Sequence, residues 1–114
     1  MQAYAIGHLT NVRFGPGVVE YLERIDATLA PFGGRFVIHG GPQEAKEGVF
    51  GGTLIVIEFP DIQHARDWYD SPAYRAILPL RTDNAEGAVF LMEGVDASHK
   101  ATDVLPARAV EYAR

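Results

Sequence analysis

His39 and Glu58 are the two residues of this sequence that we single out for moving a proton. An imidazole exchanges protons near neutral pH, and a carboxylate at the end of an apolar strand can serve as a general acid or base. Both are therefore candidate catalytic residues. Each also has a structural alternative: His39 can be hydrogen-bonded across a subunit interface, and Glu58 can form an ion pair with Arg35.

Arg81 is the main candidate for binding a negatively charged group, because its planar guanidinium matches the two oxygens of a carboxylate. Tyr74 can donate a hydrogen bond into the same cleft. Pairing of Arg81 with Asp83, or capping of a helix end, remains open as an alternative. The full set of expected substrate-binding residues is Arg81, Tyr74, Ser71, Arg35 and His8.

Composition excludes several other chemistries. The absence of cysteine excludes disulfides, thiolate metal sites and a cysteine nucleophile. No metal-ligand spacing, phosphate-binding glycine loop or nucleophile elbow occurs, and we expect neither a metal nor a cofactor. A formal net charge of -5 without any cluster of Lys or Arg argues against a nucleic-acid partner.

The sequence also lacks the features of a membrane or secreted protein. Its longest apolar runs, near 54–57 and 88–92, are far shorter than the ~20 residues that cross a bilayer. No charged and apolar leader precedes the first expected strand. We therefore expect a cytoplasmic protein without a membrane partner.

Periodicity and turn residues predict four strands and two helices. The first helix ends at Gly33-Gly34, and the second begins at Asp61 and restarts at Ser71-Pro72, where Ser can cap and Pro suits the first helical position. The glycine-rich segment 41–52 predicts a long hairpin connection. The expected strands are 3–9, 34–40, 53–59 and 88–92. The expected helices are 18–32 and a second one that follows Asp61 and precedes the turn at Asp83-Asn84.

The order βαββαβ predicts an α+β, ferredoxin-like fold. Right-handed crossovers place both helices on one face of a four-stranded antiparallel sheet with the order 4-1-3-2. This domain spans residues 1–95. Residues 96–114 are a C-terminal extension, which we expect to be loose or docked on a partner.

Side-chain alternation predicts that the second face of the sheet is mixed in character. Arg35 and Glu58 should touch there, while His8 and His39 should lie ~10 Å apart, too far to share a metal. Because apolar residues share this face, we expect a second copy to cover it and form a dimeric α/β barrel. The expected helix-facing set is Ala3, Ala5, Gly7, Phe36, Ile38, Ile55, Ile57 and Phe59; the expected open-face set is Tyr4, Ile6, His8, Arg35, Val37, His39, Leu54, Val56 and Glu58.

Several motifs together resemble a known family, and the resemblance covers about residues 2–95. They are Gly33-Gly34-Arg35-Phe36, His39-Gly40-Gly41, Val56-Ile57-Glu58-Phe59-Pro60, Trp68-Tyr69-Asp70-Ser71-Pro72-Ala73-Tyr74, and Arg81. They resemble DUF1330, a family of domains of unknown function in the dimeric α/β-barrel superfamily. The resemblance implies a ferredoxin-like subunit and a homodimer. The superfamily also includes cofactor-independent monooxygenases, isomerases and haem-binding proteins.

The leading hypothesis is a small cytoplasmic homodimer that binds a small organic molecule, with anions among the candidates. Its expected cleft is lined by His39, Glu58, Tyr74 and Arg81. One alternative is a cofactor-independent monooxygenase or isomerase that uses acid/base chemistry. Another is a non-catalytic interaction module, in which the same residues satisfy one another across the dimer.

Overall fold

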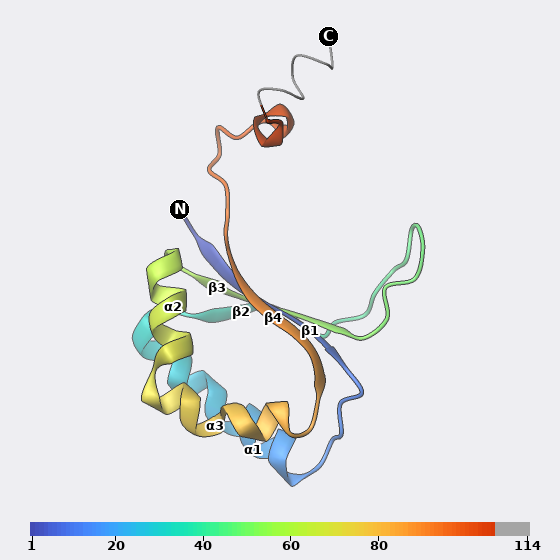
Figure 1. The fold of residues 1–114 in the computed structure, drawn as a ribbon, viewed down its shortest axis with the longest axis vertical. Helices are drawn as coiled ribbons and strands as arrows, with labels where there is room; N and C mark the ends of the chain where they lie inside the picture. Colours follow the sequence, from blue (N-terminus) through green and yellow to red (C-terminus); the bar gives the residue numbers. More distant parts are fainter. Residues whose placement is uncertain (107–114) are drawn as a thin grey trace.

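The computed structural model describes residues 1–106 of the 114-residue chain, and its elements follow the predicted order (Figure 1). The predicted break in the second helix divides it into α2 and α3. The strands are β1 (Ala3–Thr10), β2 (Arg35–His39), β3 (Thr53–Phe59) and β4 (Glu86–Glu93); the helices are α1 (Pro16–Leu29), α2 (Ile62–Asp70) and α3 (Pro72–Thr82), with short 3-10 helices η1 (Ala30–Phe32) and η2 (Ala101–Val104).

The four strands form one antiparallel sheet in the order β2-β3-β1-β4. Read from the other edge, this is the predicted order 4-1-3-2. The helices α1, α2 and α3 lie on one face of the sheet, and no helix of residues 1–106 covers the second face (Figure 1). The predicted ferredoxin-like fold is confirmed.

The core lies between the helices and the sheet and is rich in aromatic side chains. Trp68, Tyr74 and Phe59 are almost fully buried, and the Trp68 ring centroid lies 4.1 Å from that of Tyr74 and 5.4 Å from that of Phe59. Nε1 of Trp68 donates a hydrogen bond of 3.0 Å to Oγ1 of Thr28. This bond satisfies the buried indole and joins α2 to α1.

Ser71 separates α2 from α3 as the sequence predicts. Its hydroxyl accepts a hydrogen bond from the backbone N–H of Tyr74 at 3.3 Å and donates one to the carbonyl oxygen of Trp68 at 2.7 Å. Pro72 occupies the first turn of α3, where its missing N–H costs no helical hydrogen bond. The cap thereby fixes where α3 starts and which way Tyr74 points.

A β-bulge in β2 corrects the predicted side-chain faces. Phe36 pairs with Ile57, but the next paired residue is Ile38, opposite Val56, so Val37 is an extra residue. An extra residue inverts the alternation that follows it. His39 consequently pairs with Ile55 and lies on the helix side, whereas Ile38 moves to the open face. The open-face position predicted for His39 and the helix-facing position predicted for Ile38 are both wrong.

Two segments extend from this core. The 40–52 hairpin, which joins β2 to β3, projects beyond the edge of the sheet (Figure 1). After β4 the chain leads to η2, and residues 107–114 of the predicted extension lie outside the described residues. The domain boundary at residue 95 stays a prediction. Within residues 1–106, no helix is both long enough and apolar enough to span a bilayer.

Candidate functional site

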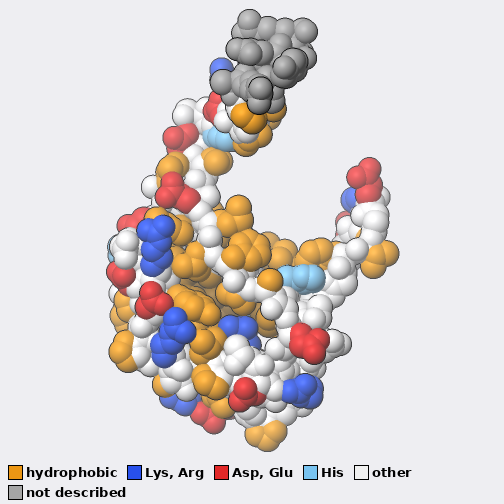
Figure 2. All heavy atoms as spheres, viewed as in Figure 1, with side chains coloured by type: hydrophobic (Ala, Val, Ile, Leu, Met, Phe, Trp, Pro, Cys, Tyr) orange, Lys and Arg blue, Asp and Glu red, His pale blue; other side chains and the backbone are white. Residues whose placement is uncertain are grey.

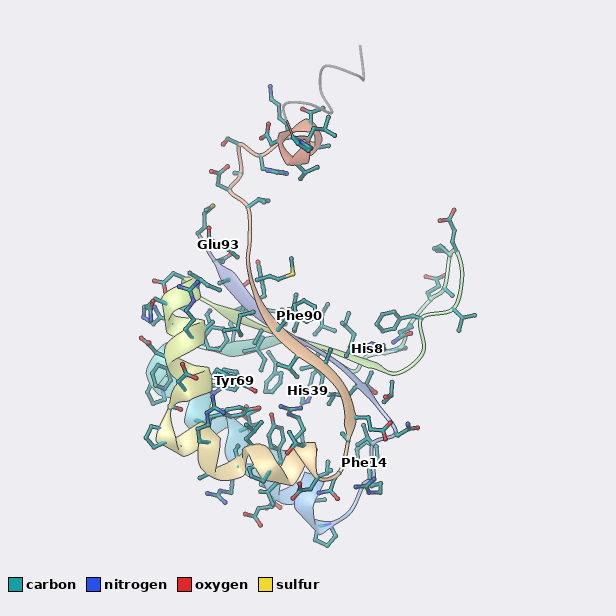
Figure 3. All side chains as sticks on the ribbon, in the orientation of Figure 1. His8, Phe14, His39, Tyr69, Phe90 and Glu93 are labelled. Atoms are coloured by element: carbon teal, nitrogen blue, oxygen red, sulfur yellow. The ribbon has the colours of Figure 1, made fainter. Side chains whose placement is uncertain are left out.

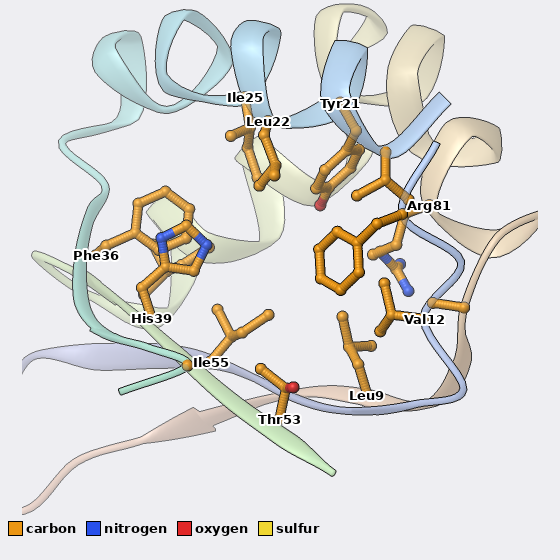
Figure 4. A pocket seen from close by; sticks show the side chains of 15 residues that line it. Leu9, Val12, Tyr21, Leu22, Ile25, Phe36, His39, Thr53, Ile55 and Arg81 are labelled. Atoms are coloured by element: carbon orange, nitrogen blue, oxygen red, sulfur yellow. The ribbon is translucent and has the colours of Figure 1, made fainter. Parts of the chain in front are cut away.

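A cavity of about 290 Å³ opens between the helices and the sheet. Leu9 and Ile55 approach it from the sheet, and Leu22 and Ile25 approach it from α1 (Figure 4). Most of its wall is therefore apolar. The polar side chains that reach it are Tyr21, His39, Thr53 and Arg81.

Arg81 brings a positive charge to the wall of this cavity. It lies in the last turn of α3 and is partly buried. Within residues 1–106, no carboxylate lies within ion-pair distance of its guanidinium. The predicted alternative of an Arg81–Asp83 ion pair is therefore not formed. Burial alone would lower the pKa of Arg81, but the hydroxyls of Tyr74 and Tyr21 outweigh it and hold that pKa above its usual range.

Tyr21 and Tyr74 form a hydroxyl pair beside this guanidinium. Their oxygens lie 2.7 Å apart, and the two rings meet edge to face with centroids 6.1 Å apart. Burial raises the pKa of Tyr21, Tyr74 raises it further, and Arg81 opposes both effects. Because one hydroxyl donates to the other, the hydrogen of the accepting hydroxyl remains available to another acceptor. The pair and Arg81 together form a group of hydrogen-bond donors.

His39 stands on the opposite side of the cavity from Arg81 (Figure 4). Its ring stacks on Phe36, with centroids 4.2 Å apart and an interplanar angle of 10°. In Figure 3, His39 lies on the helix side of the sheet, whereas His8 and Phe90 lie on the other side. The bulge at Val37 therefore places a proton-exchanging group across an apolar space from a guanidinium.

Comparison with known proteins establishes the family. The sequence model of DUF1330, a domain of unknown function, matches residues 2–95. The chain belongs to the DUF1330 family. None of the curated proteins compared with it by sequence is significantly similar.

Solved structures share the fold of this DUF1330 domain at low sequence identity. The RPA0582 protein of unknown function from Rhodopseudomonas palustris has a TM-score of 0.62 at 14% identity, covering 83% of each chain. A dimeric ferredoxin-like protein of unknown function from Jannaschia has a TM-score of 0.60 at 12% identity, covering 84% of this chain and 100% of the other. SnoaB, a cofactor-independent oxygenase from Streptomyces nogalater, has a TM-score of 0.57 at 16% identity, covering 87% and 98%.

Glu58 and Arg35 lie on the face of the sheet opposite the cavity. Nη2 of Arg35 is 3.0 Å from Oε1 of Glu58, so the predicted contact between them is confirmed. Gln2 also reaches this carboxylate, at 3.4 Å. Because Glu58 pairs with Tyr4 in the sheet and does not line the cavity, the expected cleft shared by Glu58 and Arg81 is not formed.

His8 and Ser71 also lie away from the cavity. Nε2 of His8 donates to the carbonyl oxygen of Gly51 at 2.8 Å, and its ring packs on Phe50 with centroids 4.5 Å apart. These contacts hold the base of the 40–52 hairpin against the open face. Ser71 is a buried helix cap. Of the seven predicted site residues, the structure gathers His39, Tyr74 and Arg81 on the helix side of the sheet.

Tyr21 and Thr53 are the polar residues of the cavity that the sequence did not single out, and Tyr21 is the one beside Arg81. It falls three residues after Val18 and four before Ile25, on the apolar face of α1. That spacing indicates a core position, and a tyrosine there needs a partner for its hydroxyl.

Among residues 1–106, no cluster of three His, Asp or Glu side chains is arranged to hold a metal ion.

Proposed function

We propose that this DUF1330 domain binds a small, mostly apolar organic molecule that carries one anionic or strongly accepting oxygen group. The observation that carries the proposal is Arg81, which has no carboxylate partner in the described chain and lies beside the Tyr21–Tyr74 pair in a mostly apolar wall. Buried or half-buried charges in proteins generally have a partner. A ligand carboxylate would supply that partner.

The volume of the cavity limits the size of this ligand. Pockets for drug-sized molecules span about 300–1,000 Å³, so a cavity of about 290 Å³ lies at the small end. A single ring with a short acidic side chain is of suitable size. Phenylacetate combines these features and is a simple probe of the site.

Arg81→Gln is expected to weaken phenylacetate binding about ten- to hundredfold, because hydrogen bonds to charged groups contribute about 1.5–3 kcal/mol. A ligand-observed NMR titration measures the affinity. Arg66→Gln is the matched control, since Arg66 is exposed on α2 and outside the cavity. Equal affinity of wild-type protein and the Arg81 variant would contradict the proposal.

Cofactor-independent proton transfer, as an isomerase or oxygenase would use, is the second candidate function. His39 favours it, because an imidazole across the cavity from Arg81 can take a proton while the guanidinium holds the resulting negative charge. SnoaB, described as a cofactor-independent oxygenase, has the same fold.

His39→Gln separates catalysis from binding. Proton exchange at the carbon next to the carbonyl of 1-phenyl-2-propanone in D₂O is followed by NMR. If His39 is a base, the wild type accelerates exchange over buffer, and the variant loses at least about tenfold of that acceleration while phenylacetate still binds. Wild-type exchange at the buffer rate would remove this candidate.

We also propose that a second copy covers the open face, as expected of a dimeric α/β barrel. Ile38, Phe90 and Met92 keep 44%, 44% and 51% of their surface exposed there. Figure 2 shows hydrophobic side chains gathered on this side, between the base of the 40–52 hairpin and the C-terminal segment. The cytoplasmic location expected from the sequence stays a prediction.

A further inference from the structure

A smaller cavity of about 40 Å³, the inner cavity, adjoins the main cavity. Both cavities share part of their walls, including Tyr21 and Arg81. The hydrogen-bond donors of these two residues therefore lie where the cavities meet. The inner cavity alone reaches Ala5, Gly7, Trp68, Tyr74 and Val89.

Gly7 creates part of this inner space by having no side chain. It lies on the helix-facing side of β1, paired with Ile55 and Val89 on the neighbouring strands. A Cβ at this position would lie 3.7 Å from Cγ2 of Val89 and 3.8 Å from Cβ of Ile55, which are ordinary van der Waals distances. Its backbone is not in the left-handed region either. Neither packing nor backbone conformation therefore demands a glycine here.

The wall of the inner cavity is suited to an alkyl group, because most of its side chains are apolar. Its polar side chains are chiefly Tyr21, Tyr74 and Arg81, the groups proposed to bind the anionic end of the ligand. Ala5, Gly7 and Val89 add no polar side chain.

We propose that the inner cavity is a subsite for a one- or two-carbon branch next to the anionic group of the ligand, and that Gly7 determines its size. The inference rests on the proposed ligand-binding function. A carboxylate at Arg81 would leave the ring of the ligand in the outer cavity, while a substituent on the carbon between them enters the inner one. The preferred class is then the α-branched aryl acid over its unbranched parent.

A series of three acids tests the subsite: phenylacetate, 2-phenylpropanoate and 2-phenylbutanoate. In the wild type each added carbon is expected to tighten binding about fourfold, the ratio that corresponds to ~0.8 kcal/mol per buried CH₂. Trp68 is the only tryptophan of the chain and lines the inner cavity, so its fluorescence reports entry of the branch. The branched acids should change this emission more than phenylacetate does.

Gly7→Ala is expected to fold and to bind phenylacetate with an affinity within about twofold of that of the wild type. It should bind the branched acids no more tightly than phenylacetate. Val89→Ala enlarges the subsite and should extend the gain to 2-phenylpentanoate. Gly41→Ala is the matched control, because a Cβ there meets nothing within 4 Å and Gly41 lines neither cavity. It should keep the wild-type gain.

Three results would overturn the inference, and they differ in whether the proposed function fails as well. If phenylacetate binds with the expected dependence on Arg81 but the branch adds no affinity, or adds the same affinity in Gly7→Ala, the subsite is refuted and the proposed function stands. If phenylacetate does not bind at all, both fail. An unfolded Gly7→Ala protein would also refute the subsite, because it would show that packing requires the glycine.

Discussion

Arg81 carries a positive charge in the wall of the main cavity, which is otherwise mostly apolar. The hydroxyls of Tyr21 and Tyr74 are the polar groups beside it. An arginine here gains from its place in the last turn of α3, where the helix dipole favours positive charge. The tyrosine hydroxyls accept hydrogen bonds from the guanidinium and bring no negative charge while they stay protonated. The guanidinium is therefore poised for an anion that the described chain does not provide.

Tyr21→Phe is expected to reduce the fall in the free energy of unfolding at alkaline pH. Folding raises the pKa of Tyr21, chiefly by burial, so above about pH 10 the unfolded chain releases a proton that the folded chain keeps. The stabilisation is thus complete below about pH 10 and is lost as pH rises further. The free energy of unfolding falls by at most about 1.4 kcal/mol per pH unit for this proton.

Urea unfolding between about pH 8 and pH 11 measures this slope. Tyr4→Phe, which removes a hydroxyl from the open face of the sheet, is the matched control for the loss of one tyrosine. The same alkaline slope in Tyr21→Phe and wild-type protein would contradict the coupling between burial of Tyr21 and stability.

Residue types alone pointed to Arg81 and Tyr74, because Arg and Tyr near the end of a helix suit ligand binding whatever the details of the fold. They did not point to Tyr21, whose spacing is that of a core residue. Glu58 is the opposite case, because its residue type suggested a role in the site that its position in the sheet does not allow. Its contact with Arg35 follows from antiparallel register, but alternation alone puts it on the face away from the cavity.

The elements that position the site were predictable where local signals agree. The strand 53–59 was predicted with the bounds that β3 has, since an apolar run lies between turn residues. The break at Ser71-Pro72 was predictable because both residues have clear positional preferences. The bulge at Val37 was not, because Arg35-Phe36-Val37-Ile38-His39 reads as regular alternation without a glycine to mark an extra residue.

Ser71→Ala is expected to lower the free energy of unfolding by about 1 kcal/mol, the usual cost of losing a helix N-cap. It removes the acceptor for the N–H of Tyr74 and the donor to the carbonyl oxygen of Trp68. Because Ser71 lines neither cavity, the free energy of phenylacetate binding should change less than the free energy of unfolding does. Urea unfolding and the NMR titration measure the two effects.

Ser98→Ala, an exposed serine after β4, is the control for loss of a hydroxyl. A stable Ser71→Ala protein with strongly weakened phenylacetate binding would contradict the structural role of Ser71 and favour the substrate-binding role first expected for it.

At the scale of the whole molecule, the two faces of the sheet have different roles. Its helix side holds the cavity, and its open side presents apolar residues that a second copy is proposed to cover. A cavity formed within one protomer does not need the second copy to complete its wall. Dimer formation and ligand binding are therefore separable by substitution.

Phe90→Glu is expected to convert the proposed dimer into a monomer of half its mass, because a charge at the centre of an apolar interface loses hydration without gaining a partner. Sedimentation measures the mass, and circular dichroism checks that the fold is kept. Val19→Glu is the control, since Val19 is equally apolar and 50% exposed on α1. A wild-type protein that sediments as a single 12.5 kDa protomer at micromolar concentration would contradict the dimer.

A crystal structure with phenylacetate bound tests the central claim most directly. The carboxylate is predicted to lie about 2.7–2.9 Å from the guanidinium of Arg81, with the ring between α1 and the sheet. A carboxylate bound elsewhere, such as at Arg35 on the open face, with the Arg81 cavity left unoccupied, would contradict it.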